Sequence, residues 1–326
     1  MPTRGTDDPL FDFLSYARPG PGRRDRLTPA QLQQIARTVG RTPEVMVKVL
    51  PRGASDLRAV RRHLDYIGRK GDVDLETGDG QTLRGAHVGK RLIDEWDLDL
   101  EHQRTRADLV SRPGRQPPRL VHKLVFSMPA GTSSDKVLEA VRHFCREEFA
   151  LKHRYIMALH TDEPHPHVHV VVKAVSEHGH RLNIRKATLR EWRSDFARHL
   201  RGAGVPANAT QRFVRGEMKS RKSDPIYRAN LRGESTYMRK RSGVVARDML
   251  GGRVPFEPGR APVVATRHDV QRAWREISES LIRERQRDLA ETVKRFAGEM
   301  CAPITEWERI TRDLHAHLQG PRTREG

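Results

Sequence analysis

The sequence predicts an α+β protein with a central antiparallel β-sheet and helices mainly on one face. Residues 154–160 and 167–172 alternate as two strands around a six-residue segment with two prolines, which indicates a β-hairpin. Residues 120–127 have an apolar majority on both faces, which is typical of a central strand. Apolar residues at helical spacing flank these strands and recur after residue 265, so an amphipathic helical layer and a helical C-terminal region are expected.

Composition limits the class of partner. The chain has 326 residues, with 61 Lys+Arg against 42 Asp+Glu and a net charge of +19, which predicts a polyanionic ligand. No run of 18 apolar residues occurs, so membrane insertion is not expected. The N-terminus lacks the apolar region of a signal peptide, and the cytoplasm is therefore the expected location. The two cysteines, Cys145 and Cys301, are too isolated to indicate a disulfide framework or a thiolate metal site.

Four parts are expected along the chain. They are an N-terminal basic arm (1–43), a central domain with the strands above (44–215), a basic linker (216–264) and a helical C-terminal region (265–326). The arm contains a turn-rich basic stretch at residues 19–26, after which Thr28 and Pro29 predict the start of a short helix. The proposed linker is basic, has little periodicity and ends in a Gly/Pro-rich stretch.

The central domain contains predicted elements in a mixed order. Residues 45–50 are strand-like, and Ser55 is the expected cap of a helix whose apolar stripe includes Leu64 and Ile67. Further helices are expected over residues 87–96, 134–149 and 189–200, and a long one begins at a capping-box pattern, residues 266–269.

The hairpin carries the main candidate site. Side chains alternate along a strand, so His167 and His169 share one face, and pairing brings His160 across from them. A lone histidine is ordinarily a solvated side chain, and His178 and His180 are expected to be solvated or phosphate-facing. Three converging imidazoles behind a valine-rich strand instead predict a divalent-metal site with open coordination positions, as in a catalytic centre.

Tyr66 is the candidate nucleophile. It lies off the apolar stripe of its helix, just before Gly68, and Arg69 and Lys70 follow. Nearby cations favour a phenolate, so a tyrosine in this position is suited to nucleophilic catalysis. The alternative interpretation is a surface tyrosine whose ring rests on the protein.

Four segments of the chain together resemble a known family. They are Leu64-Asp-Tyr-Ile-Gly-Arg-Lys-Gly71, Ser127-Met-Pro-Ala-Gly-Thr132, His160-Thr-Asp162 and His165-Pro-His-Val-His-Val-Val-Val172. They resemble the conjugative relaxases of the tyrosine-using HUH endonuclease class, in particular the branch of the border-nicking endonuclease of T-DNA transfer. The similarity covers about half of the chain, roughly residues 45–204, and implies an HUH/relaxase-like fold for the central domain.

The resemblance also implies roles for individual residues. Tyr66 would be the nucleophile, and His160, His167 and His169 would be the metal ligands. Ser127 would contact a substrate phosphate, and Asp162 would orient a ligand histidine or assist deprotonation of the tyrosine. The chain departs from the family at Lys173, where relatives commonly carry asparagine; an ammonium there could still contact a phosphate.

The expected activity is site- and strand-specific nicking and joining of DNA for conjugative transfer or mobilisation. Tyrosine transesterification gives a 5′-phosphotyrosine and a free 3′-hydroxyl, and keeps the energy of the phosphate ester. Single-stranded DNA at a transfer origin is the expected substrate, with Arg69, Lys70, Arg185 and Lys186 contacting phosphates. Mg or Mn is expected as the ion in use, although three imidazoles favour Zn, Ni or Cu by affinity. Accessory DNA-binding proteins and a conjugation coupling protein are the implied partners.

Two alternatives remain open. The same His-x-His chemistry serves rolling-circle replication initiators and transposases, which the nicked substrate would distinguish. A non-enzymatic DNA-binding accessory protein with a structural zinc is the other; it predicts a closed coordination shell and no effect of removing Tyr66.

Overall fold

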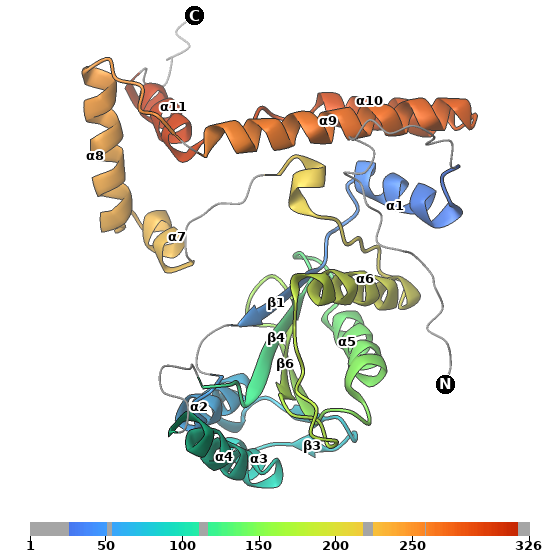
Figure 1. Cartoon of the computed structure of the whole chain (residues 1–326), viewed down its shortest axis with the longest axis vertical. Coiled ribbons are helices and arrows are strands. Elements are labelled where there is room, and N and C mark those ends of the chain that lie inside the picture. The colour runs from blue at the N-terminus through green and yellow to red at the C-terminus, as the bar shows by residue number, and fades with distance from the viewer. Residues whose placement is uncertain (1–25, 51–53, 111–116, 218–223, 258, 319–326) are drawn as a thin grey trace, which may run out of the picture. The chain divides into compact units, whose positions relative to one another are not determined.

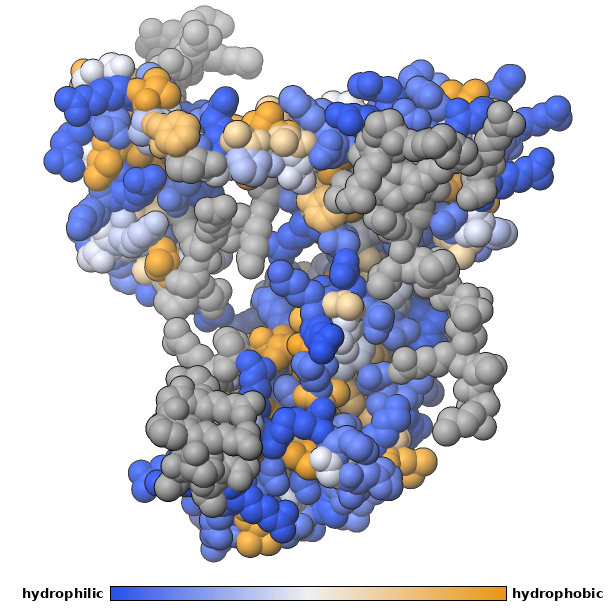
Figure 2. Space-filling view, in the orientation of Figure 1, coloured by the Kyte–Doolittle hydropathy of each residue, from blue (hydrophilic) through white to orange (hydrophobic). Residues whose placement is uncertain are grey.

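The computed structural model describes residues 26–50, 54–110, 117–217, 224–257 and 259–318. The chain divides into two compact units, one formed by residues 41–209 and the other by the segments before and after it. Each unit is described by itself below (Figure 1). Most of the surface visible in Figure 2 is hydrophilic, with small hydrophobic patches, as expected from the net charge of +19. No helix of the described residues is both long and apolar enough to cross a membrane.

The unit of residues 41–209 is built on a six-stranded antiparallel sheet with the order β1-β4-β6-β5-β2-β3. The predicted α+β class with a central antiparallel sheet is thus confirmed. The two strands of the predicted hairpin and the predicted central strand occupy the middle of the sheet. The strands are β1 (Met46–Leu50), β2 (Leu75–Thr77), β3 (Thr82–Leu83), β4 (Val121–Ser127), β5 (Tyr155–His160) and β6 (His167–Lys173).

The register of the central strands decides which side chains share a face. His160 of β5 lies directly across from His167 of β6, and Ala158 lies across from His169. On the other side of β6, Ser127 of β4 pairs with His167. Because side chains opposite each other in a pair point to the same face, the three histidines and Ser127 line one face of the sheet.

The opposite face is covered by the two longest helices of this unit, α5 (Ser134–Phe149) and α6 (Lys186–Gly202). Aromatic rings interlock there: Phe126 of β4 lies 4.8 Å from Phe144 and 5.2 Å from Phe196 between ring centroids. The alternate valines of β6, Val168, Val170 and Val172, are buried in the same cluster. Burial of this much apolar surface makes the central strands a rigid base for the histidines.

The histidine face is partly covered by helices as well (Figure 1). α2 (Leu57–Ile67), α3 (Val88–Glu95) and α4 (Leu98–Val110) lie on this side, and Leu64 and Ile67 of α2 pack in one cluster with Ile156 of β5. Helices therefore cover the face opposite the histidines, and they cover the histidine face only over β5 and β6. The N-cap of α2 is Asp56, whose carboxylate accepts from Ala59 N, and not the expected Ser55, because the helix begins one residue later.

The other unit combines the N-terminal helix with C-terminal helices. In α1 (Pro29–Val39) the expected start is confirmed, since the Thr28 hydroxyl accepts from Gln31 N and the Gln31 side chain accepts from Thr28 N. Ile35 of α1 packs in one cluster with residues of α9 (Arg260–Arg283) and α10 (Arg287–Gly298), including Trp274. The Trp274 indole N–H donates to the carbonyl of Val214, which is in the short helix η3 (Arg212–Arg215). The described part of the expected basic arm is thus packed with the C-terminal region.

The described part of the segment expected as a basic linker, residues 216–264, contains α7 (Asp224–Leu231), α8 (Thr236–Leu250) and the first residues of α9. Ser235 caps α8 by accepting from Met238 N, and Val245 is buried against Trp307 and Ile310 of α11 (Glu306–Leu318). Residues 19–25 and 218–223, also expected as basic linker sequence, lie outside the described residues.

The long helix α9 starts earlier than the capping-box pattern at residues 266–269 predicted. It begins at Arg260, so Thr266 lies inside it and donates its hydroxyl hydrogen to Pro262 O. Pro262 is tolerated because it occupies the first turn, where the missing N–H has no partner in the helix.

A candidate metal and tyrosine site

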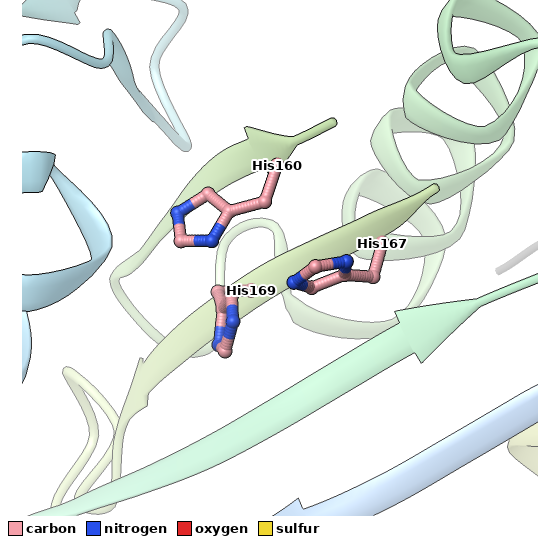
Figure 3. A group of neighbouring side chains, drawn as sticks. All are labelled: His160, His167 and His169. Atoms are coloured by element: carbon pink, nitrogen blue, oxygen red, sulfur yellow. The ribbon is translucent and has the colours of Figure 1, made fainter. Parts of the chain in front are cut away.

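Three imidazoles converge on the sheet face (Figure 3). His160 projects from the end of β5, and His167 and His169 project from the start of β6. One nitrogen atom of each ring lies within 4.8 Å of the corresponding atoms of the other two. The group therefore has the spacing of ligands that share one metal ion.

Backbone carbonyls orient two of the three rings. His160 Nε2 lies 2.7 Å from Ile67 O, and His167 Nδ1 lies 3.0 Å from His165 O. A carbonyl only accepts, so each of these nitrogens carries a proton, and in the neutral ring the other nitrogen has the lone pair. In His160 this other nitrogen, Nδ1, lies 3.2 Å from Arg69 Nη2, so a metal ion would replace the arginine as its partner. Metal-binding histidines commonly have this arrangement, because the N–H bond fixes the ring orientation and the tautomer.

The third histidine has a nitrogen ready for a ligand. His169 Nδ1 is buried, and no described residue forms a hydrogen bond with it. Burial, followed by the nearby His160 and His167, lowers the pKa of His169 to about 3, and burial also lowers the pKa of His160. Both imidazoles are thus neutral at pH 7, which is the form that coordinates a cation. By donor type and spacing, the three histidines fit a divalent metal ion.

Tyr66 lies next to this group. It is in the last turn of α2 and is 52% exposed, whereas its neighbours Leu64 and Ile67 are fully buried. Its ring centroid is 6.3 Å from that of His160 and 6.1 Å from that of His169. The phenol is therefore accessible to a ligand from solvent that also contacts the imidazoles.

Arg69 links Tyr66 to the expected acidic residue. Its guanidinium carbon lies 5.0 Å from the centroid of the Tyr66 ring, and its Nη2 atom is 2.5 Å from Asp162 Oδ2 and 3.2 Å from His160 Nδ1. The resemblance implied that Asp162 orients a ligand histidine or assists deprotonation of Tyr66. The hydrogen bond that the structure describes for its carboxylate is with neither residue. The carboxylate instead holds Arg69.

The turn after Tyr66 has an unusual backbone. Arg69 and Lys70 have φ values of 48° and 57°, in the left-handed region, and Gly71 has a φ of 110°. Left-handed conformations of non-glycine residues cost of order 1–3 kcal/mol each and are concentrated at functional sites. The turn directs the guanidinium of Arg69 back over the Tyr66 ring, whereas Lys70 is exposed.

Replacement of Gly71 by alanine is expected to destabilise the protein by about 2–4 kcal/mol. A Cβ atom there would lie 2.6 Å from the backbone of Gly85, in addition to the strain of a φ of 110°. Thermal unfolding measures the effect. Gly85→Ala is the matched control, because Gly85 has a φ of 103° but no atom within 4 Å of its added Cβ. An equal loss in both variants would contradict the role assigned to close packing.

The remaining predicted residues are distributed over the unit. Ser127 is buried, directly across from His167. Lys173 is at the opposite end of β6, 3.9 Å from Glu177, and so is not beside the imidazoles. Arg185 and Lys186 are at the start of α6, which packs on the other face of the sheet. The structure therefore brings Ser127 to the histidines, but not these three basic residues.

Two further residues of the site were not singled out from the sequence. His63 precedes Tyr66 by one helical turn. Its ring is stacked on the Tyr66 ring, with 6.2 Å between centroids, and lies edge-on to the His169 ring at 6.0 Å. Lys123 of β4 is 5% exposed and lies on the histidine face. Periodicity could have identified both residues. Residues three apart share a helix face, and Lys123, Val125 and Ser127 are two apart along the strand, so they point to the same face.

Comparison with known proteins defines the class. Residues 73–201 match the family model of the MobA/VirD2-like relaxase nuclease domain. The resemblance inferred from the motifs is thus confirmed, and residues 73–201 are similar to a relaxase nuclease domain. The matched range includes all three histidines and begins after Tyr66.

Three similar proteins carry the name T-DNA border endonuclease VirD2. The chain is 27% identical over 150 residues to the T-DNA border endonuclease VirD2 of Rhizobium radiobacter, a match that covers 42% of this chain and 33% of the relative. It is 28% identical over 147 residues to the proteins of the same name from Rhizobium rhizogenes and Agrobacterium fabrum, with 42% of this chain and 32% of each relative covered. The chain therefore spans about a third of the length of these relatives.

Proposed function

We propose that the protein is a relaxase that nicks and rejoins one DNA strand at a transfer origin through a covalent bond to Tyr66. The observation that carries the proposal is the position of the Tyr66 ring, about 6 Å from the rings of His160 and His169. A phosphodiester that reaches the metal-binding nitrogens would thereby also be next to the phenol oxygen. Proximity of this kind is a large part of the rate enhancement in phosphoryl transfer.

The reaction exchanges one ester bond for another. The Tyr66 oxygen attacks phosphorus and loses its proton, and the bond from phosphorus to the 3′-oxygen breaks, so that the leaving oxygen is protonated to a 3′-hydroxyl. The product is a 5′-phosphotyrosine, and attack by a 3′-hydroxyl reverses the step without loss of bond energy. Exposure of Tyr66 allows the DNA strand to approach and to remain attached.

His160, His167 and His169 would hold the divalent ion. When bound, such an ion draws electron density from the non-bridging phosphate oxygens and neutralises charge that develops on them. Mg or Mn is proposed as the ion in use, with Zn, Ni or Cu as alternatives of higher affinity. Ser127 is positioned on the same face to donate a hydrogen bond to a phosphate oxygen.

Arg69 is proposed to neutralise the phenolate and the phosphate, and Asp162 to position it. The guanidinium lies over the Tyr66 ring and is fixed from the other side by the carboxylate. An arginine in a fixed orientation stabilises phosphoryl-transfer charge better than a mobile one, because less reorganisation is needed. Asp162 is thus a positioning residue, which acts through Arg69.

Asp162→Asn is accordingly expected to slow formation of the covalent adduct about tenfold, since the ion pair with Arg69 is lost. Metal affinity, measured by isothermal titration calorimetry, should stay within about twofold, because the carboxylate contacts no metal-binding ring. A large loss of metal affinity would instead support the role of orienting a ligand histidine.

The direct test of the function uses labelled single-stranded DNA from the element's own transfer origin. A covalent complex that survives denaturation is expected with metal and not with a chelator. Failure to form it with any candidate origin, despite DNA binding, would favour the DNA-binding accessory alternative, whereas nicking at a replication origin or transposon end would favour the other HUH classes. Accessory DNA-binding proteins, a coupling protein and action in the cytoplasm are parts of the same proposal.

A further inference from the structure

The histidine face of the sheet is covered unevenly. Over β5 and β6, the side chains of Ile156, Ala158 and Val171 are buried beneath α2 and α3. Over β1, on the same face, Met46 and Leu50 are only half-buried and Lys48 is exposed. The three imidazoles therefore lie at the boundary between a covered half and a half that no described helix of this unit covers.

Strand register places Lys48 on the open half and Lys123 at its border with the covered half. Val125 of β4 lies across from His169, and Lys48 of β1 lies across from Val125, so these three residues form one row. Lys123 is two residues from Val125 on β4 and is a diagonal neighbour of His169, at roughly 7–8 Å. Lys48 is two strand spacings from His169, about 10 Å.

Lys123 is unusual because a lysine on a central strand is rarely this deeply buried. Only 5% of its surface is exposed, and it lies directly across from Val171 of β6, two residues from His169.

The side chains between the lysines are apolar. Met46, Val125 and Leu50 are half-buried and lie on the same face as Lys48 and Lys123. Surfaces that bind single-stranded nucleic acid combine cations for successive phosphates with apolar platforms for sugars and bases. The open half of the sheet has both components, in a strip that begins at the imidazoles.

Building on the proposed function, we propose that the single DNA strand leaves the imidazole group over β4 and β1, with Lys123 and Lys48 contacting its phosphates. Met46, Val125 and Leu50 contact the sugars or bases between them. The strand cannot follow the other direction on this face, because α2 and α3 cover β5 there. This path assigns the grip on DNA to β1 and β4 and not to the start of α6.

The test measures binding of a fluorescein-labelled oligothymidylate of about 20 nucleotides to the full chain by fluorescence anisotropy, in chelator and over a range of salt. Lys48→Gln is the first variant; its exposed side chain makes misfolding a minor concern. The second is Lys48→Gln combined with Lys123→Met, with thermal unfolding as the check on folding. Lys152→Gln is the matched control, because Lys152 is exposed and precedes the end of β5 that is remote from His160.

Lys48→Gln should weaken binding several-fold. It should also reduce the slope of log affinity against log salt by about 0.7, as expected for one lost phosphate contact. The double variant should reduce this slope by about 1.4, as expected for two lost contacts. Lys152→Gln should leave the slope unchanged. An unchanged slope in Lys48→Gln, or equal losses in Lys48→Gln and Lys152→Gln, would overturn the path; if the double variant does not fold, Lys48→Gln alone decides. Since binding in chelator requires no cleavage, a failure of the relaxase proposal would appear separately, as absence of the covalent adduct in the unaltered chain.

Discussion

Tyr66→Phe is expected to abolish the covalent protein–DNA adduct. The yield of adduct should fall at least about 1,000-fold, to below the detection limit of the assay. Removal of the only oxygen that can form the ester leaves the reaction without its nucleophile, whereas the ring and its contacts stay. The stacking on His63 and the cation contact of Arg69 depend on the ring and should remain. Binding of single-stranded DNA is therefore expected to change by less than about twofold.

Tyr237→Phe is the matched control for this experiment. Tyr237 is 48% exposed, close to the 52% of Tyr66, but it is in α8, outside the unit that contains the histidines. It should form the adduct at the normal rate. A Tyr66→Phe protein that loses DNA binding and adduct formation equally would count against the nucleophile and favour a binding role for this tyrosine.

The second large effect is expected from His167→Ala. Loss of one of three ligands should reduce metal affinity by at least about 100-fold. Mutation of a residue that only hydrogen-bonds to a metal ligand already reduces metal affinity by about 10–100-fold. His167 is only half-buried, so the fold should tolerate the change better than truncation of His160 or His169. Adduct formation should fall in parallel and recover in part at high Mn concentration.

Metal binding can be followed without activity. In the unaltered chain a saturating divalent ion is expected to raise the unfolding temperature, with about 2.7 kcal/mol of stabilisation at 100 times the dissociation constant. His167→Ala should lose this shift, and His178→Ala should keep it, because His178 is an exposed histidine in a turn after β6. An equal shift in His167→Ala would mean that the ion binds elsewhere.

Local periodicity was sufficient to predict the main parts of the site. The alternation of His167, Val168 and His169 predicted the strand, its two faces and its pairing with His160, and the register confirms these. The 3.6-residue period of α2 predicted that Tyr66 lies off the core face, and the residue is 52% exposed. Both depend on backbone geometry that one segment determines by itself.

Contacts between distant segments could not be predicted in this way. Arg69 and Asp162 are 93 residues apart, and their pairing depends on how α2 packs on the sheet and on the left-handed turn after Tyr66. For the same reason, the sequence did not show that Arg185 and Lys186 lie at the start of α6, which packs on the face of the sheet opposite the histidines. Packing of α1 with α9 and α10 likewise depends on residues more than 200 positions apart. The net charge of a sequence indicates a polyanionic ligand, but it does not show on which face of the sheet each basic residue lies.

The most direct measurement identifies the amino acid that carries the DNA. The covalent complex is treated with nuclease and protease, and the peptide that retains a nucleotide is sequenced by mass spectrometry. The chain has five tyrosines, and among those that the structure describes Tyr155 is buried while Tyr227 and Tyr237 are in α7 and α8. The 5′-phosphate is predicted on Tyr66 alone; a nucleotide on another tyrosine, or on a serine such as Ser127, would contradict the assignment.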